Sequence, residues 1–324
     1  MIGIGDVEDA ARRLSGVAVE TPLLENTELN RISGGTVLIK PECFQVTGSF
    51  KIRGAYNVMS RFTSEQLGHG VVAFSSGNHA QGVAAAARIL GARATIVMPA
   101  DAPRTKLENT RKLGAEVITY DRYTGNREAI AQEIAAERGA EIVPSFDHPH
   151  IIAGQGTVGL EVAEQSQSLG RPAEQVLICC GGGGLTAGSA IALTARLPGV
   201  AIHTVEPEGF DDTARSLAAG HRVRVLPSAR SICDALLAET PGKITFDINR
   251  RLVGRGLVVS DDEVREAMRF AFRTLKITVE PGGAVALAAV LSGKIETEGK
   301  ITAIVISGGN VDIELFAAIQ LEPK

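Results

Sequence analysis

The chain has 324 residues, of which 44% are hydrophobic and 22% are charged, and its formal net charge at pH 7 is -4. A chain of this length and composition can bury a large core, and we expect it to fold into two lobes. The balanced charge, without dense runs of lysine and arginine, argues against a nucleic-acid partner. The N-terminus lacks the pattern of a signal peptide and the chain lacks an apolar stretch long enough to cross a membrane, so we expect a cytoplasmic protein without a membrane partner.

Strand-like and helix-like segments alternate along the chain. Apolar runs predict strands over residues 71–74, 94–99, 115–120, 175–180 and 201–206. Helical periodicity predicts helices over residues 80–90, 103–113, 126–138, 151–165 and 185–197. This alternation predicts an α/β fold with two three-layer α/β/α lobes, in which helices cover mostly parallel sheets. We place a large lobe in residues 1–62 plus 148–324 and a small, inserted lobe in residues 63–147.

A lysine directly follows a phenylalanine in the stretch GSFKIRGAYN, residues 48–57. Taken alone, Lys51 would be interpreted as a solvated lysine on the polar face of a helix, which is the commoner situation. Whether Lys51 has a function therefore depends on which groups the rest of the chain places beside it.

A run of glycines, GGGGLTAG at residues 181–188, lies between a predicted strand and a predicted helix. Glycines in such a place allow backbone N–H groups to turn inward and to hold a phosphate at the helix N-terminus. A tight strand-to-helix turn alone would need only one or two glycines. Four in a row therefore favour a phosphate site.

A nicotinamide dinucleotide is one ligand with such a phosphate. Gly182, Gly184 and Ala187 fit the G-x-G-x-x-A form of the dinucleotide fingerprint, and Glu206 ends the next predicted strand at about the distance expected for the acid that binds the ribose. An NAD-dependent oxidoreductase is therefore an alternative. It would leave Lys51 and a second glycine-rich turn, SSGNH at residues 75–79, without a role.

Two more polar turns follow apolar runs. The hydroxyls, amide and backbone N–H groups of SSGNH are suited to bind a carboxylate or a phenolate, although a simple helix cap would use the same residues. AIVISGGNVD, residues 303–312, repeats the order of strand, small polar turn and glycines. A lysine amine, a phosphate cradle and polar groups at strand ends are together what pyridoxal phosphate requires: a covalent bond, an anchor for the phosphate, and partners for the ring oxygen and nitrogen.

Seven motifs in order carry a resemblance to a known family: GSFKIRGA, SSGNHAQG, IAGQGT, GGGGL, VEPEGFDD, EPGGAVALAA and SGGNVD. Together they resemble the fold-type II pyridoxal-phosphate-dependent enzymes, in the branch that holds threonine/serine dehydratases and serine racemase, over residues from about 20 to 315. This resemblance implies a fold like that of the tryptophan synthase β subunit, pyridoxal 5'-phosphate bound in the large lobe, and a homodimer.

The resemblance also implies roles for single residues around the cofactor. Lys51 would form the covalent bond to the cofactor and take the Cα proton once the substrate has displaced it, with Phe50 packed beside the ring. Asn78 would bind the phenolic oxygen, and Ser307 would be the neutral partner of the pyridine nitrogen. The phosphate loop would consist of Gly181, Gly182, Gly183, Gly184 and Leu185.

For the substrate, the resemblance implies that one loop holds the carboxylate, and that Ser76 faces the side of Cα opposite Lys51, as in racemases. Arg127 is a weaker candidate for the carboxylate, since an exposed charge at a helix start would look the same. We assign His79 no proton transfer. The carboxylate loop would consist of Ser75, Ser76, Gly77, Asn78 and His79.

A cation site is implied by the motif VEPEGFDD, in which Glu206, Asp212 and the carbonyl of Phe210 would offer oxygen ligands suited to Mg²⁺ or Ca²⁺. The same acidic loop could instead only cap the helix that follows it.

The expected activity is that of a threonine/serine dehydratase, an ammonia-lyase that converts a hydroxy amino acid to a 2-oxo acid and ammonia by β-elimination. Threonine and serine are expected because the sequence shows no obvious second anion site. Cys43, Phe44 and Ala235 differ from the usual family residues near the pocket. They leave three alternatives open: 3-hydroxyaspartate as the substrate, a bulkier 3-hydroxy amino acid as the substrate, and serine racemisation.

Overall fold

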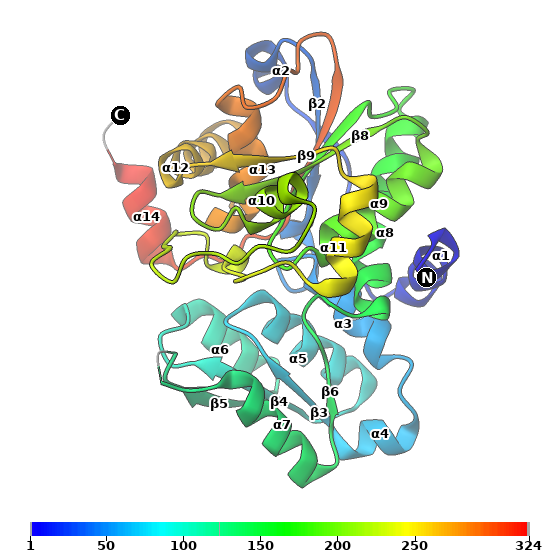
Figure 1. The fold of residues 1–324 in the computed structure, drawn as a ribbon, viewed down its shortest axis with the longest axis vertical. Helices are drawn as coiled ribbons and strands as arrows, with labels where there is room; N and C mark the ends of the chain where they lie inside the picture. The colour runs from blue at the N-terminus through cyan, green and yellow to red at the C-terminus, as the bar shows by residue number, and fades with distance from the viewer. Residues whose placement is uncertain (1, 123, 323–324) are drawn as a thin grey trace.

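The computed structural model describes residues 2–122 and 124–322, which form two lobes, each built around its own sheet (Figure 1). The large sheet has six strands in the order β1-β2-β10-β7-β8-β9. Strand β1 is antiparallel to β2, and the other neighbours are parallel. Its strands are β1 (Leu24–Glu25), β2 (Thr36–Pro41), β7 (Gln175–Cys179), β8 (Ala201–Pro207), β9 (Arg255–Val259) and β10 (Ile301–Ile306).

The small sheet has four strands in the order β5-β4-β3-β6, and all its neighbours are parallel. Its strands are β3 (Val71–Phe74), β4 (Ala94–Pro99), β5 (Glu116–Tyr120) and β6 (Glu141–Ile142). The predicted α/β fold with mostly parallel sheets is therefore confirmed. The five strands predicted from apolar runs all form, because parallel strands covered on both faces have nearly continuous apolar sequences.

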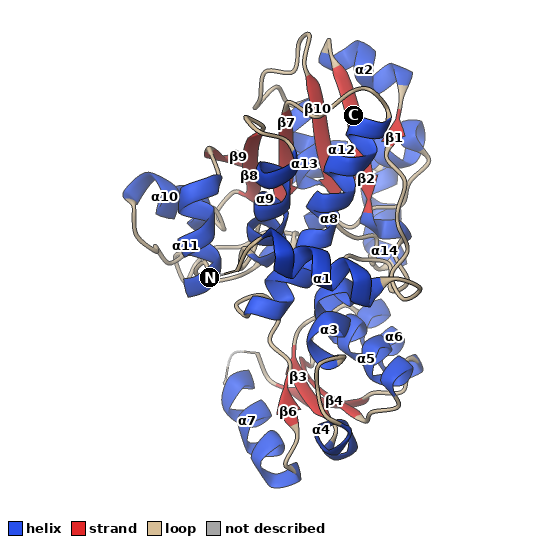
Figure 2. Cartoon of the chain, turned by 90° about the vertical axis from the view of Figure 1, so that its right-hand side faces the viewer, coloured by secondary structure: helices blue, strands red, loops and turns tan. Residues whose placement is uncertain are grey.

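Helices lie along both sheets (Figure 2). Those in or next to the small lobe are α3 (Lys51–Met59), α4 (Ser64–His69), α5 (Asn78–Leu90), α6 (Arg104–Lys112) and α7 (Arg127–Arg138). Those of the large lobe are α1 (Ile4–Leu14), α2 (Thr27–Ser33), α8 (Pro149–Ser168), α9 (Gly184–Arg196), α10 (Asp212–Ala219), α11 (Lys243–Leu252), α12 (Asp261–Phe270), α13 (Pro281–Leu291) and α14 (Ile313–Leu321). Short helical turns span Glu42–Phe44, Asp234–Leu236 and Ala271–Leu275.

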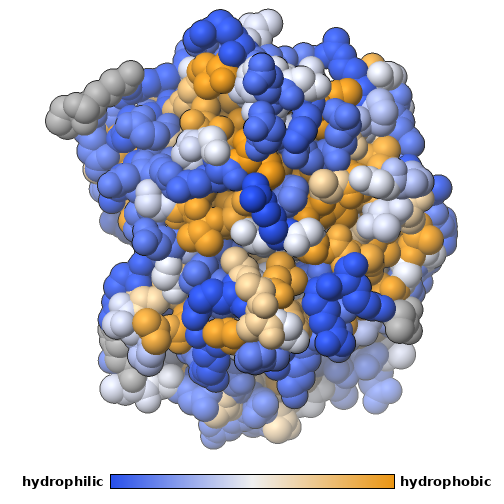
Figure 3. Space-filling view, turned by 45° about the horizontal axis from the view of Figure 1, so that its top comes forward, coloured by the Kyte–Doolittle hydropathy of each residue, from blue (hydrophilic) through white to orange (hydrophobic). Residues whose placement is uncertain are grey.

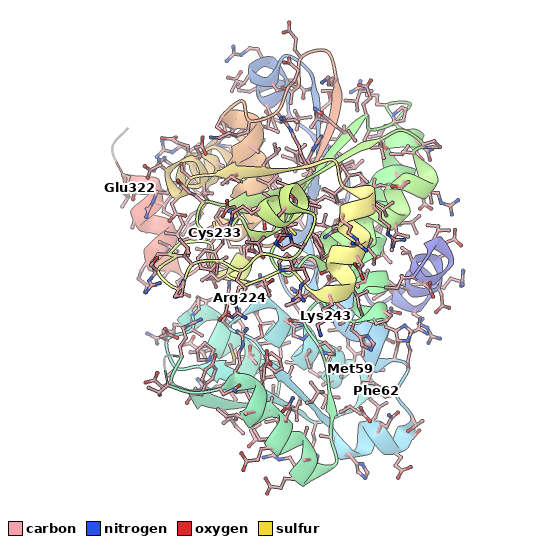
Figure 4. All side chains as sticks on the ribbon, in the orientation of Figure 1. Met59, Phe62, Arg224, Cys233, Lys243 and Glu322 are labelled. Carbon is pink, nitrogen blue, oxygen red and sulfur yellow. The ribbon has the colours of Figure 1, made fainter. Side chains whose placement is uncertain are left out.

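Helix α3 connects the lobes. Its buried residues Ile52, Val58 and Met59 pack into the core beneath the small sheet, and Figure 4 labels Met59 beside that lobe. These residues belong to the predicted large lobe, residues 1–62 plus 148–324, although they pack against the small sheet. The lobe boundaries stay a prediction. On the face shown in Figure 3, hydrophobic residues gather around the middle of the molecule and hydrophilic residues cover most of its outer parts.

Glycines of the IAGQGT motif let three helices approach closely. A β-carbon on Gly154 of α8 would lie 2.5 Å from the carbonyl oxygen of Arg53 in α3, and one on Gly156 would lie 2.6 Å from that of Gly188 in α9. Only glycine allows this contact. Helix α8 therefore packs closely against both the helix that begins at Lys51 and the helix that begins at the glycine run.

The turns that follow β3, β7 and β10 carry the polar and glycine-rich motifs, and each lies at the carboxyl end of a parallel strand. In open α/β sheets, ligands bind at this edge. Within residues 2–122 and 124–322, no helix is both long enough and apolar enough to cross a membrane.

Candidate active site

One cavity of about 310 Å³ contains the residues that the sequence predicts for the cofactor and the substrate carboxylate. They reach it from α3, from the turn after β3, from the turn after β7 and from the end of β10. These residues are Phe50, Lys51, Ser75, Ser76, Gly77, Asn78, His79, Gly181, Gly182, Gly183, Gly184, Leu185 and Ser307. The structure brings them together, and their individual roles stay predictions.

Lys51 is the first residue of α3, and its amine points into the cavity. Its Nζ donates a hydrogen bond to the carbonyl oxygen of Ser145 at 3.0 Å and lies 5.1 Å from the centre of the Phe50 ring. Burial lowers the pKa of Lys51 to about 8, because a charged amine is disfavoured away from water. A useful fraction of the amine is therefore neutral, and nucleophilic, near neutral pH.

The SSGNH turn leads into the N-terminus of α5 at the cavity wall. The N–H of Gly77 donates to Oγ of Ser75 at 3.1 Å, and Gly77 has no side chain with which to cap the helix. The first N–H groups of α5 are thus left to a ligand, and a helix N-terminus favours an anion. This geometry suits the binding of a carboxylate better than a role as a simple helix cap.

His79 lies within the first turn of α5. Its pKa is lowered to about 3, mainly by burial and also by the nearby amine of Lys51. Its Nε2 lies 3.0 Å from the carbonyl oxygen of Val143, to which a neutral ring donates. His79 is therefore uncharged at physiological pH, and the assignment of no proton transfer to it stays a prediction.

Asn78 is held at both ends of its amide. Its Nδ2 donates to Oε1 of Glu280, and its Oδ1 accepts from Nδ2 of Asn310 at 2.9 Å. Glu280 in turn accepts from Nζ of Lys106 at 2.8 Å, and the same amine lies 2.7 Å from Oδ2 of Asp234. The two carboxylates raise the pKa of Lys106, although burial opposes them. A buried charged network thus fixes the residue predicted to face the phenolic oxygen.

The turn formed by the glycine run requires glycine at residues 182–184. Gly183 has φ +92°, a conformation that disfavours any side chain. A β-carbon on Gly182 would lie 2.4 Å from the ring of Phe146, and one on Gly184 would lie 2.5 Å from Oε1 of Gln155. Helix α9 begins at Gly184 after a residue without a side-chain cap, so its first N–H groups are left for an anion.

Ser307 directly follows β10 and is buried next to Cys179, whose thiol hydrogen-bonds with it. Burial raises the pKa of Cys179 to about 11, so the thiol stays neutral. Both residues are uncharged, so neither would hold a ring nitrogen in its protonated form. This is the setting expected for the predicted partner of a pyridine nitrogen.

The residues predicted for a cation lie outside this cavity. Glu206, at the end of β8, accepts the N–H groups of Thr213 at 2.9 Å and Ala214 at 2.7 Å. Both carboxylate oxygens of Asp212 are buried and have no hydrogen-bond partner among the described residues. Burial raises the pKa of Asp212 to about 7 and, together with Asp212, raises that of Glu206 well above its usual range.

Unpaired, buried carboxylate oxygens fit a hard cation. The residues 2–122 and 124–322 contain no cluster of three or more His, Cys, Asp or Glu side chains that could hold a metal. A cation would therefore need the Phe210 carbonyl and further oxygen ligands besides the two carboxylates. The cation site stays a prediction.

Several residues of the cavity wall had no role in the sequence analysis, among them Ser145, Phe146, Lys106 and Gln155. Ser145 acts through its backbone carbonyl, so its side chain carries no signal. Lys106 lies in a segment that has the sequence of an ordinary charged helix. Gln155 belongs to the IAGQGT motif, whose spacing could have identified it.

The cavity fits pyridoxal phosphate. It offers an amine of lowered pKa, a glycine cradle that side chains would fill, and a neutral residue pair, Cys179 at the end of β7 and Ser307 after β10. The model of the pyridoxal-phosphate dependent enzyme family matches residues 14–308. The chain therefore belongs to this family, and pyridoxal phosphate is its cofactor.

Individual relatives are similar over nearly the whole chain. The L-threo-3-hydroxyaspartate ammonia-lyase of a Pseudomonas species is 45% identical over 97% of this chain and 97% of its own. The L-threonine ammonia-lyase of Thermotoga maritima is 40% identical over 98% of this chain and 78% of its own. The structure of maize serine racemase superposes with a TM-score of 0.92 at 37% identity, covering 98% of this chain and 96% of that one.

Family membership argues against the dinucleotide alternative. The structure agrees, because the Glu206 carboxylate accepts N–H groups at the start of α10, and Glu206 is absent from the wall of the cavity that contains the glycine run. An acid for a ribose would have to face that cavity.

Proposed function

We propose that this chain is an ammonia-lyase that eliminates the β-hydroxyl of a 3-hydroxy amino acid. The observation that carries the proposal is the Lys51 amine, whose pKa burial lowers to about 8, in one cavity with the N-termini of α5 and α9. An amine of this kind can act both as a nucleophile and as a base. The relatives named above include ammonia-lyases, which supports the reaction class.

Different residues bind the substrate, bind the cofactor and remove the proton. The N-terminus of α5 and the hydroxyls of Ser75 and Ser76 bind the substrate carboxylate, and the α9 N-terminus binds the cofactor phosphate. Pyridoxal phosphate, which Lys51 would hold in the resting enzyme, would withdraw electrons from the substrate Cα once the substrate amine has taken the place of Lys51. The Lys51 amine, displaced by the substrate amine, removes the Cα proton. The β-hydroxyl leaves as water, taking up one proton for the one that Lys51 removed, and hydrolysis of the resulting enamine by water gives a 2-oxo acid and ammonia.

Arg127 supports the proposal of a substrate with a second carboxylate in place of threonine or serine. Arg127, at the start of α7, lines the cavity, and its Cζ lies 5.6 Å from the centre of the Phe74 ring, next to the SSGNH turn. Arg127 has no acidic partner among the described residues, whereas Arg122 is paired with Asp101 at 2.9 Å. Glu128 also lines the cavity and opposes this attraction. We therefore propose L-threo-3-hydroxyaspartate as the preferred substrate.

A second candidate is serine racemisation, because Ser76 lines the same cavity as Lys51 and could exchange a proton from the other side of Cα. A racemase needs acid–base groups on both faces of the substrate.

The test is an assay of the purified holoenzyme for 2-oxo acid and for D-serine. The values of kcat/KM are compared for L-threo-3-hydroxyaspartate, L-threonine and L-serine. Borohydride trapping, done separately, locates the cofactor. An adduct on Lys51, with oxaloacetate formed at the highest kcat/KM, is the expected result. D-Serine formed faster than pyruvate would move the assignment to racemase, and no oxo acid from any of the three would reject the lyase.

A further inference from the structure

The IAGQGT motif places Gln155 in the wall of the cavity without an assigned role. Gln155 lies in α8, is 1% exposed and lines the same cavity as Lys51. A β-carbon on Gly54 of α3 would lie 3.1 Å from its Cγ, and one on Gly184 of α9 would lie 2.5 Å from its Oε1. Gln155 therefore lies between the helix that carries Lys51 and the helix that begins at the glycine run.

The orientation of the Gln155 amide is fixed by Ser145. Nε2 of Gln155 donates to the Ser145 carbonyl oxygen at 3.4 Å, and the same oxygen accepts from Nζ of Lys51 at 3.0 Å. Because a carbonyl oxygen accepts and cannot donate, the NH₂ group faces Ser145 and Oε1 faces away from it. The Lys51 amine and the Gln155 amide thus share one acceptor and are neighbours.

Oε1 of Gln155 is a buried acceptor with no hydrogen-bond partner in residues 2–122 and 124–322. A buried acceptor without a donor costs free energy, so native structures almost always supply one. The Lys51 amine is a donor within the same cavity, and a protonated lysine has three N–H groups, of which the Ser145 carbonyl takes one.

We propose that Gln155 is a positioning residue that, together with the Ser145 carbonyl, holds the displaced Lys51 amine toward the Cα of the substrate. The displaced amine would otherwise rotate at the end of a flexible side chain. An amide oxygen is a suitable partner because it is uncharged and does not keep the amine protonated, as a carboxylate would. This inference rests on the proposed role of Lys51 as the base.

In the described part of the chain, the titratable groups that interact electrostatically with the Lys51 amine are His79 and Cys179. His79 on α5 is neutral, since burial lowers its pKa to about 3, and Cys179 at the end of β7 is neutral, since burial raises its pKa to about 11. A charge introduced at residue 155 would therefore act on the amine without an opposing charge from these neighbours.

The experiment compares Gln155→Leu and Gln155→Glu with Gln167→Leu and Gln167→Glu in the holoenzyme. Gln167 is exposed on the same helix, so these variants repeat the change away from the cavity. The first readout is the exchange of the Cα proton of L-alanine in D₂O by NMR, which reports proton removal alone because alanine has no β-leaving group. The second is the pH titration of the visible absorption of the resting holoenzyme.

Gln155→Leu is expected to slow exchange at saturating alanine at least about tenfold, with KM changed less than about threefold, because the amine is misplaced rather than the substrate. Gln155→Glu is expected to move the rising limb of the exchange rate, and the spectral titration, up by about one pH unit. The Gln167 variants are expected to match the wild type.

Exchange within about threefold of the wild type in Gln155→Leu, with unchanged titrations in Gln155→Glu, would overturn the inference. If Gln155→Leu does not fold, the titrations of Gln155→Glu decide alone. A wild type that exchanges alanine but makes no oxo acid from hydroxy amino acids would reject the proposed function and still leave the role of Gln155 measurable.

Discussion

A single residue, Lys51, is expected to determine the pH dependence of the reaction. Burial lowers its pKa to about 8, and only the neutral amine accepts a proton. The rate of proton removal is therefore expected to rise with pH through about 8 and to level off above it.

Lys51→Ala is expected to lower kcat at least about 1,000-fold, since both the covalent bond and the base are lost.

The measurement is the pH profile of kcat together with mass spectrometry of the borohydride-reduced protein. Lys112→Ala, an exposed lysine on α6, is the control and is expected to leave both unchanged. A reduced adduct that survives in Lys51→Ala would contradict the assignment of this lysine.

Arg127 is the residue on which substrate choice is expected to depend. Arg127→Gln is expected to lower kcat/KM for L-threo-3-hydroxyaspartate by about 10- to 100-fold, the effect of one charge-assisted hydrogen bond, and to change kcat/KM for L-serine less than about threefold. Arg111→Gln, at an exposed arginine of α6, controls for the loss of one positive charge. Equal losses for both substrates would show that Arg127 does not contact the second carboxylate.

The residues that the sequence could identify are those whose identity is required by the backbone or by chemistry. The glycine run is recognisable because side chains at Gly182 and Gly184 would collide with Phe146 and Gln155, and Gly183 has a conformation that other residues rarely adopt. Ser145 could not be found, because any residue offers the same carbonyl. Arg127 was considered but ranked low, since a helix-start arginine gives no sign of the cavity beside it.

Helix α11 shows how an element is stabilised by a distant part of the chain. Gly242, which precedes it, has no side chain, and Asp147 accepts the N–H groups of Lys243 at 2.9 Å and Ile244 at 2.8 Å instead. Figure 4 labels Lys243 at the end of α11 that faces the junction between the lobes. Thr245 then donates through Oγ1 to the carbonyl oxygen of Gly182 at 2.7 Å. The cap on α11 therefore also supports the glycine run.

Asp147→Ala is expected to lower the free energy of unfolding by about 1–2 kcal/mol, as loss of a cap does, and to weaken pyridoxal phosphate binding. Urea unfolding and the cofactor dissociation constant are the two measurements. Ser260→Ala removes a cap from α12, where Oγ accepts the N–H of Glu263 at 3.2 Å, and is expected to lower stability alone. Asp147→Asn keeps an acceptor and should recover much of both effects. Unchanged cofactor binding in Asp147→Ala would show that α11 does not support the loop.

The helices and strands themselves were more predictable than such caps. Strands β3, β4 and β7 formed where apolar runs predicted them, because burial on both faces selects an apolar residue at nearly every position. The cap on α11 joins residues 96 or more positions apart, and no local pattern marks it.

For the whole molecule, the relation between the lobes depends on α6. Asp312 of the large lobe accepts the N–H groups of Arg104 at 3.1 Å and Thr105 at 2.8 Å, the first residues of this small-lobe helix. In the next position, Lys106 lies between Glu280 and Asp234 of the large lobe. One turn of α6 thus meets three carboxylates, which favour the positive end of a helix. Sequence reasoning predicted two lobes, but it could not show which charges connect them.

Lys106→Met is expected to lower the free energy of unfolding by about 3–5 kcal/mol, because it leaves the buried Glu280 carboxylate without its cation. The double variant Lys106→Met with Glu280→Gln is expected to recover part of this loss, since the orphaned charge is then removed as well. Urea unfolding measures both, and Lys112→Met, an exposed lysine of the same helix, is the control.

The same variant bears on the lobes themselves. With α6 detached from Asp234 and Glu280, the segments near residues 62 and 147 are expected to be cleaved faster by limited proteolysis under native conditions, because the small lobe then opens more often. Cleavage at these two places would also support the predicted lobe boundaries. If Lys106→Met loses stability but its cleavage pattern and rate stay those of the wild type, the network stabilises the cavity wall without holding the lobes together, and closure depends on Asp312 and α3 instead.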